Sequence, residues 1–401
     1  MSDSKAVSEE YRAALEAWMQ KQYDGSATGS GRTWPRLSFQ EALALTELTA
    51  GSDSHGRSVK RFVSRRPAWK PGGELPWDLL FKDLKGPRPM HQGPGVFGGV
   101  VYAQAPLAAA RAIEAEDQGE TGADTGKKPR GKLGIHSIQG VFTSPGLRDR
   151  PFVFEVSSLS TGKSFATRLV SVRQPTQPSD PPTGPFPASD ADKPLKNVCF
   201  TCMTTFKRSV PTQDDVQTAQ SAQQRYADML SKRKPHEWPI SPQSDVDLVR
   251  DLFPHEGPGA FPVLDMHKVD MRKYNEDRPL SERRELIYYR LLEPLPRDDV
   301  NAHIVCHAFE ADRNGLIMLG NHIGYGYSMG NAASLSYSFY VHVNPDEAVM
   351  GDQEWWLQEV SWPRVSAGRC MMECRIWSPQ GRHIASAYQD GIILPSKTPK
   401  L

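Results

Sequence analysis

Residues 93–98 (GPGVFG) have the G-x-G-x-x-G spacing of a dinucleotide-binding turn, in which glycines let the backbone approach a pyrophosphate. That turn requires a strand directly before it. The preceding residues 85–92 (KGPRPMHQ) make a poor strand. We therefore interpret these glycines as positions where a sheet packs close to a buried helix, and we expect no nucleotide cofactor.

Residues 326–330 (GYSMG) match the G-x-S-x-G string of a serine nucleophile elbow. Asp352 and His383 follow Ser328 in the order that a triad would need. However, the elbow requires a strand before the serine and a helix after it, whereas residues 331–343 alternate like a strand. We therefore favour a strand over a serine triad here.

The same strand carries hydroxyl groups at regular spacing. The alternation places Ser334, Ser336, Ser338 and Tyr340 on one face, and Leu335, Tyr337, Phe339 and Val341 on the other. Asp312 stands at the start of a predicted helix, where an Asp is usually only a cap, and Gln389 lies in the last predicted strand. Taken one at a time, these residues do not indicate a site.

The five cysteines are few and odd in number, which favours a reduced, intracellular protein. Cys199 and Cys202 form a C-x-x-C within a strand-like run, with no second pair to complete a zinc site. We interpret both as buried thiols and expect no metal.

Charge and hydropathy exclude further classes of protein. Lys and Arg number 48 against 47 Asp and Glu, so no electrostatic reason favours nucleic acid as a partner. The polar N-terminus is unlike a secretory signal. The most apolar run, Val96–Ile113, contains Gln104, Pro106 and Arg111 and predicts a buried helix rather than a membrane span.

The arrangement of predicted elements repeats along the chain. A capping box at Ser38 and Glu41 predicts a helix over the apolar run 42–48. The helix at Val96–Ile113 and a second one at about Asp312–Leu319 are each followed by strands. In the first half these strands are predicted at 136–142, 152–157, 164–173 and 197–206, after an earlier one at 58–63; in the second half at 334–343, 355–360, 369–377 and 383–394. Two copies of a helix followed by antiparallel strands predict a duplicated α+β unit, the hot-dog fold.

These patterns predict five regions. They are a leader at 1–36, a first hot-dog domain at 37–208, a Pro-rich connector at 209–262 with a helical piece near 217–230, a second hot-dog domain at 263–396 and a tail at 397–401. The polar stretch 116–132 is predicted to be an exposed loop, and 174–194 a disordered loop.

Together the strings resemble the acyl-CoA thioesterase II family, the TesB-like double hot-dog thioesterases. The first-half match lies in VFGGVVYAQAPLAAA, IHSIQGVFTSPG and GKSFATR, and the second-half match in AFEADRNGL, AASLSYSFYVH and YQDG. The resemblance implies an enzyme that hydrolyses fatty or related acyl-CoA to the free acid and CoA, without a metal or other cofactor. It implies further that Asp312, Ser334 and Gln389 orient the attacking water, with a helix N-terminus available for the oxyanion.

The matched strings also supply candidate substrate-binding residues, namely Gly98, Gly99, Gln104, His136, Ser336 and Tyr337. Ser336 and Tyr337 stand where the family has Asp and His. This departure leaves open a non-catalytic acyl-CoA-binding protein. A thioesterase for polyketide or fatty acyl groups on carrier proteins is a further alternative.

Two predictions concern the cell and the assembly. The cysteine content predicts an intracellular protein. The resemblance adds a peroxisomal location, for which the ending Pro399-Lys400-Leu401 is an imperfect signal, with the cytoplasm as the alternative. Hot-dog sheets often pair, so association into a homo-oligomer is compatible with the sequence.

Overall fold

The computed structural model describes residues 37–52, 56, 58–70, 95–121, 132–241, 263–313, 315–325 and 329–395. The leader and the C-terminal tripeptide lie outside these residues, as do parts of the 116–132 stretch and of the connector. So do Gly93 and Ser328.

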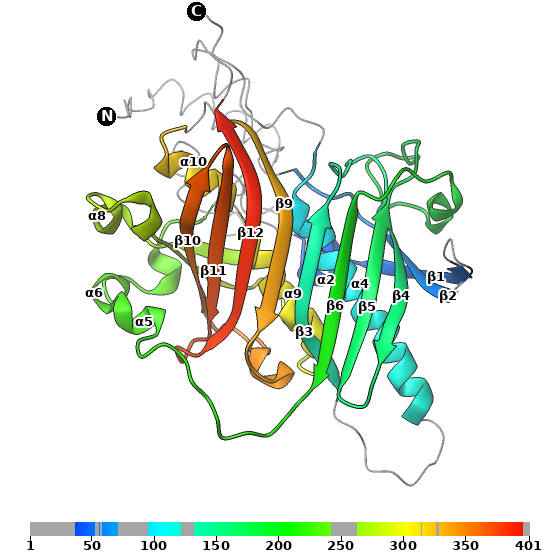
Figure 1. Ribbon diagram of the computed structural model, residues 1–401, viewed down its shortest axis with the longest axis horizontal. Coiled ribbons are helices and arrows are strands. Elements are labelled where there is room, and N and C mark those ends of the chain that lie inside the picture. The colour runs from blue at the N-terminus through cyan, green and yellow to red at the C-terminus, as the bar shows by residue number, and fades with distance from the viewer. Residues whose placement is uncertain are drawn as a thin grey trace, which may run out of the picture.

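One antiparallel sheet of twelve strands runs through the described molecule (Figure 1). In chain order the strands are β1 (Leu45–Ser52), β2 (Ser58–Ser64), β3 (Leu133–Phe142), β4 (Val153–Thr161), β5 (Phe165–Arg173), β6 (Phe200–Arg208), β7 (Leu264–Lys268), β8 (Glu285–Leu291), β9 (Met329–Val341), β10 (Trp356–Ser366), β11 (Arg369–Trp377) and β12 (His383–Pro395). The sequence predicts nine of them and misses β1, β7 and β8.

The strand order shows the duplication directly. From the outer edge inward, the first half reads β1-β2-β4-β5-β6-β3 and the second half reads β7-β8-β10-β11-β12-β9. Adding six to each number of the first half gives the second. The halves join where β3 pairs with β9, so the two sheets form one continuous surface. The predicted duplicated α+β unit is confirmed.

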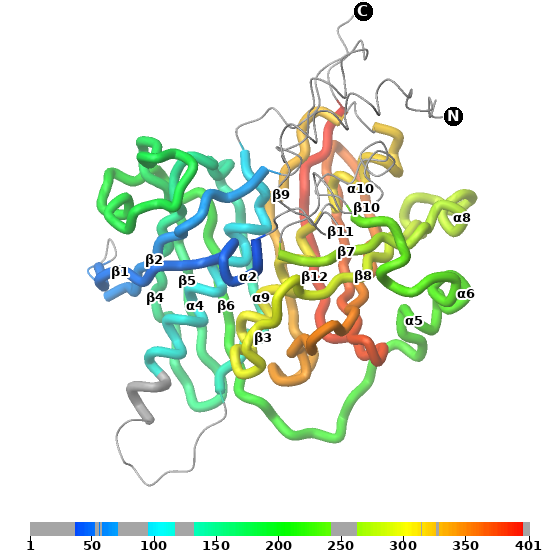
Figure 2. Tube along the Cα trace, turned by 180° about the vertical axis from the view of Figure 1, so that it is seen from behind, coloured from blue at the N-terminus to red at the C-terminus, as the bar shows by residue number. Residues whose placement is uncertain are grey.

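Two helices cover one face of this sheet (Figure 2). They are α4 (Gly98–Thr121) and α9 (Val300–Ala311), and they pack on each other as well as on the sheet. The other helices among the described residues are α2 (Phe39–Ala42), α5 (Ala222–Arg225), α6 (Ala227–Leu230), α8 (Arg272–Asn275) and α10 (Gly315–His322), with 3₁₀ turns η2 (Ala188–Asp192), η3 (Pro235–Glu237), η4 (Leu280–Glu282) and η6 (Pro345–Ala348). The main apolar core fills the layer between α4, α9 and the sheet.

The predicted second-half helix is misplaced. Asp312 ends α9 as its C-cap instead of opening a helix, and α10 starts three residues later at Gly315. The sequence does not predict α9, because the polar residues His303 and His307 interrupt its apolar pattern. Both are buried and bonded: His303 accepts from the Met350 N–H, and His307 lies 2.7 Å from the Tyr289 hydroxyl.

Three other predictions differ from the structure. The capping box at Ser38 is present, but α2 ends at Ala42 and the apolar run continues as β1. The helix α4 passes through Pro106 and runs eight residues beyond Ile113, so 116–121 is not a loop. The helical piece near 217–230 begins only at Ala222, as α5 and α6.

The prediction of a disordered loop at 174–194 is wrong. The buried Gln174 amide donates to the Leu147 and Arg150 carbonyls, and the Ser179 hydroxyl donates to Asp190. Composition predicts solvent exposure here, whereas these polar side chains provide the internal hydrogen bonds that order the loop.

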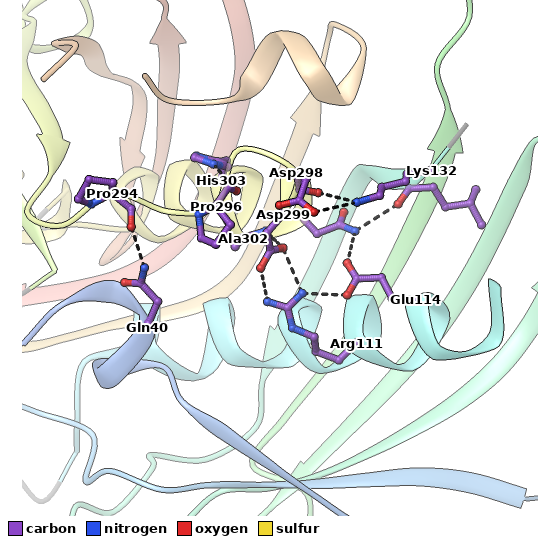
Figure 3. Close-up of polar contacts among 12 residues, drawn as sticks. Gln40, Arg111, Glu114, Lys132, Pro294, Pro296, Asp298, Asp299, Ala302 and His303 are labelled. Atoms are coloured by element: carbon purple, nitrogen blue, oxygen red, sulfur yellow. Dashed lines mark hydrogen bonds and ion pairs between the residues drawn. The ribbon is translucent and has the colours of Figure 1, made fainter. Parts of the chain in front are cut away.

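Polar contacts join α4 to the start of α9 (Figure 3). The Arg111 guanidinium donates to both oxygens of Asp299, at 3.1 and 2.5 Å, and also to Glu114. Asp299 in turn caps α9 by accepting from the Ala302 N–H. These bonds connect the first half of the chain to the second at one end of the helix pair, and the opposite end holds Asp312.

Candidate functional site

Asp312, Ser334 and Gln389 lie together beneath the helix layer. The Gln389 Nε2 atom donates to Asp312 Oδ1 at 2.6 Å and to Ser334 Oγ at 2.5 Å, while Ser334 Oγ lies 3.5 Å from Asp312 Oδ1. The carboxyl, the hydroxyl and the amide therefore form a closed triangle. Asp312 and Gln389 are buried, and Ser334 is half-buried.

Each member comes from a different element. Asp312 caps the C-terminus of α9, Ser334 lies in β9, and Gln389 lies in the neighbouring strand β12. The two strands pair in antiparallel register, with Gln389 opposite Tyr337 and Gly391 opposite Ser334. Since α9 crosses the same face of the sheet, its end brings the carboxyl over these two strands.

A bulge in β9 corrects the predicted strand faces. Asp390 pairs with Ser336 and the next residue, Gly391, pairs with Ser334, so β9 contains one extra residue at Leu335. The extra residue reverses the alternation. Ser334 therefore shares the helix-facing side with Tyr337, whereas simple alternation groups it with Ser336.

The N-terminus of α4 faces the remaining carboxyl oxygen. A Cβ built on Gly99 would lie 3.1 Å from Asp312 Oδ2, and one built on Gly98 would lie 3.7 Å from the same atom. Because the first N–H groups of a helix have no partner within it, this helix presents backbone donors beside the carboxyl. Of the glycines in the 93–98 string, Gly98 does lie close to the sheet, since a Cβ there would be 3.1 Å from the Phe142 ring of β3, whereas a Cβ on Gly95 would meet Pro145 at an ordinary 3.5 Å.

Burial controls the protonation of the carboxyl. It raises the pKa of Asp312 to about 8, and the hydrogen bond from Ser334 acts in the opposite direction. No cationic side chain is among the causes of the shift. A carboxyl with this pKa changes its charge close to neutral pH, which is the range that general acid–base chemistry uses.

The structure brings Gly98, Gly99 and Tyr337 to the triangle. Tyr337 is 1% exposed and faces the helices beside Gln389. Gln104 is completely buried on α4, and neither its amide nitrogen Nε2 nor its amide oxygen Oε1 has a hydrogen-bond partner among the described residues.

The other two substrate-binding candidates lie elsewhere. Ser336 pairs with Val141, which is 47% exposed, so both side chains are on the outer face of the sheet. The His136 ring stacks edge-on against Phe165, which is 52% exposed. The structure therefore does not bring Ser336 or His136 to the triangle.

Three residues near the triangle were not predicted. Tyr102 lies one helical turn after Gly98, and that i, i+4 spacing is the signal that could have found it. Glu310 and Arg313 flank Asp312 in α9 and in the turn after it. Both are fully buried, and the Arg313 Nε atom lies 3.7 Å from Glu310 Oε2. Burial raises the pKa of Glu310 to about 8, against the pull of the Arg313 charge.

The other motifs do not form a site. The residues after position 328 continue as β9, so a nucleophile elbow is not formed. Cys199 and Cys202 are free and buried. Within the described ranges, no group of three His, Cys, Asp or Glu side chains is arranged to hold a metal ion, and no helix is long and apolar enough to cross a membrane.

Two family models match the chain. That of the acyl-CoA thioesterase N-terminal domain matches residues 86–206, and that of the acyl-CoA thioesterase C-terminal domain matches residues 248–393. Together they cover more than half of the sequence. No curated protein sequence is similar enough to count as a match.

Solved structures support the fold. The acyl-CoA thioesterase II TesB2 of Mycobacterium marinum aligns with a TM-score of 0.53 at 19% identity, covering 90% of this chain and 99% of that one. The tesB protein of Mycobacterium avium subsp. paratuberculosis aligns with a TM-score of 0.51 at 17% identity, covering 89% and 98%. At such identities the likeness extends to the double hot-dog fold and no further.

Proposed function

The chain belongs to the acyl-CoA thioesterase family, and on that basis we propose that Asp312, Ser334 and Gln389 bind and orient the water that attacks the thioester. The enzyme hydrolyses acyl-CoA to a free acid and CoA. The observation that supports these three residues is their closed triangle of hydrogen bonds beneath the N-terminus of α4.

The proposed reaction begins with the water. Deprotonated Asp312 accepts one proton from it as the water oxygen bonds to the thioester carbon. The Ser334 hydroxyl and the Gln389 amide are not basic at neutral pH, so neither can take the proton. Their role in the proposal is to hold the carboxylate and the water in position by hydrogen bonds. A fixed geometry of this kind suffices for a thioester, which is already an activated acyl group.

The carbonyl oxygen becomes negative as the water adds. The free N–H groups of Gly98 and Gly99 at the start of α4, together with the helix dipole, are the donors that we assign to this oxyanion. The tetrahedral intermediate then breaks its carbon–sulfur bond. The CoA thiolate leaves and takes up the proton that Asp312 holds.

The acyl group is, in this proposal, fatty or fatty-like. Peroxisomal targeting and self-association stay predictions of the sequence, as do the domain limits.

Loss of the carboxyl tests the assignment. We expect Asp312→Asn to lower kcat for acyl-CoA hydrolysis by roughly 10²–10⁴-fold, the usual contribution of a general base. The assay is thiol release from short, medium and long acyl-CoAs, with circular dichroism to check the fold. Asp390→Asn is the matched control, because that carboxylate lies next to Gln389 in β12 but pairs with Arg369. Full activity of a folded Asp312→Asn protein would refute the assignment.

A further inference from the structure

Two buried phenols beside the triangle have no use in the mechanism above. Tyr102 of α4 is 0% exposed, Tyr337 of β9 is 1% exposed, and their ring centroids lie 4.4 Å apart. Neither hydroxyl has a hydrogen-bond partner among the described residues. Buried polar groups in native proteins are rarely left unpaired, so two adjacent ones indicate a partner that is not part of the protein.

The two hydroxyls come from both sides of the reaction site. Tyr337 lies directly opposite Gln389 in the β9–β12 pair, and Tyr102 lies one turn along α4 from Gly98. Burial is the largest cause of the raised pKa of both phenols, and the Asp312 charge is one of the smaller causes for each. Both phenols therefore lie beside the position that the proposed mechanism gives to the thioester.

The local backbone leaves room for both rings. Tyr337 pairs across the central joint of the sheet with Gly140, and a Cβ on Gly140 would lie 3.4 Å from the Tyr102 ring. The same Cβ would lie 2.5 Å from the Phe200 ring. The Phe200 ring therefore makes glycine necessary at position 140, and the Tyr102 ring packs beside the same position, where α4 meets β3.

Both phenols remain neutral donors across the working range of pH, because burial raises the pKa of each well above its usual value. A plain hydrocarbon chain in this layer would leave both hydroxyls unpaired. An acyl chain with an oxygen at that depth would pair them, and sites built to hydrogen-bond a substrate oxygen discriminate strongly against analogues that lack it.

We propose that this enzyme prefers acyl-CoA whose acyl group carries a hydroxyl or oxo oxygen within a few carbons of the thioester, and that Tyr102 and Tyr337 bind that oxygen. The inference rests on the proposed function, since it takes the thioester to lie at Asp312, Ser334 and Gln389. Tyr102 and Tyr337 are then specificity-determining residues, and the water attack does not depend on them.

The test compares matched substrates on the full chain. We would measure kcat/KM for a 3-hydroxyacyl-CoA and for the unsubstituted acyl-CoA of the same carbon number. The wild type should prefer the hydroxyacyl substrate by at least about tenfold, the effect of leaving one buried polar group unpaired. Tyr102→Phe and Tyr337→Phe should each remove most of this preference, because kcat/KM falls more for the hydroxyacyl substrate than for the unsubstituted one. Tyr388→Phe, on the exposed outer face of β12, should behave like the wild type.

The outcomes are distinct. Equal kcat/KM for the two substrates in the wild type would overturn the inference and leave the proposed function in place, and this result needs no variant to fold. An equal loss for both substrates in the Phe variants would also overturn it, because the hydroxyls would then act on the thioester itself. No turnover of either substrate by folded wild type would overturn the proposed function and this inference together.

Discussion

In the proposed mechanism the Asp312 carboxyl must be charged, although its surroundings favour the neutral form. Its close partners are a hydroxyl and an amide, which are neutral, and the layer around it is apolar. Burial therefore favours the protonated form and raises the pKa to about 8. As a base, the residue is active only in the deprotonated fraction.

This protonation predicts the pH dependence. We expect kcat/KM to rise with pH up to about 8 and to fall roughly tenfold for each unit below it, since the free enzyme must lose one proton. Initial rates across pH 5.5 to 9, corrected for spontaneous hydrolysis, would measure it. Glu310→Gln is the necessary control, because the pKa of Glu310 is also raised to about 8. If the rise of kcat/KM with pH disappeared in Glu310→Gln, that result would contradict the role of Asp312.

The same proton affects stability. The folded-state pKa of Asp312 lies above the ordinary value of 3.8, so the folded state binds more protons than the unfolded state between these two pKa values. The stabilisation is complete below the unfolded pKa and is lost as the pH rises through the folded pKa of about 8. We therefore expect Asp312→Asn to gain stability relative to the wild type as the pH rises from about 4 to about 8, and to keep that gain above it, as denaturant melts would measure. A constant difference across that range would show that the shift is absent.

At the scale of the element, the bulge in β9 decides which serine belongs to the site. Ser334 and Ser336 are two residues apart, so in a regular strand both side chains would point to the same face. The extra residue at Leu335 turns them to opposite faces. We expect Ser334→Ala to lower kcat by at least about tenfold, because the carboxylate and the water lose a fixing hydrogen bond. Ser336→Ala should keep its rate. Equal effects in the thiol-release assay would contradict this assignment of faces.

The start of α4 gives a second test at this scale. A methyl group at Gly99 would lie 3.1 Å from Asp312 Oδ2 and 2.4 Å from the Phe97 ring, so the ring must shift and the space beside the carboxyl is filled. We expect Gly99→Ala to lose most of its activity while the chain remains folded, since Ala is the better helix former. Gly95→Ala is the control, because its Cβ would contact only Pro145, at 3.5 Å. Unchanged hydrolysis by Gly99→Ala would argue against substrate binding there.

At the scale of the whole molecule, Asn301 connects the two repeats. Its side chain accepts from the Ile135 N–H at 2.9 Å and donates to the Leu133 carbonyl at 3.2 Å, so α9 of the second half is bonded to β3 of the first. Asn301 is 1% exposed, which means that water does not replace these bonds easily.

Removing this connection should destabilise the chain. We expect Asn301→Ala to lower the free energy of unfolding by about 1–3 kcal/mol for each backbone group left unpaired. Asn331→Ala, at an exposed position in β9, should change it by less than about 0.5 kcal/mol. Chemical denaturation of both variants measures the difference. Similar stabilities would show that the Asn301 bonds contribute little to holding the repeats together.

The pattern of residues along the chain is enough to predict the architecture and to supply the candidate site residues. Alternating strands repeated in both halves are a local signal, and the duplicated sheet follows from them. The strings around Asp312, Ser334 and Gln389 were found through their order along the chain. Three strands were missed: β1, which follows the capping box at Ser38, and β7 and β8, which flank α8.

Only the tertiary structure decided how these residues meet. Register is a property of two strands, so the bulge at Leu335, which turns Ser334 towards Asp312, is not visible in β9 alone. The helix α9 is hidden because its buried His and Asn side chains find partners in distant elements. The Tyr102 ring meets the Tyr337 ring for the same reason, because α4 packs on β3 where that strand pairs with β9, and folding alone creates this contact.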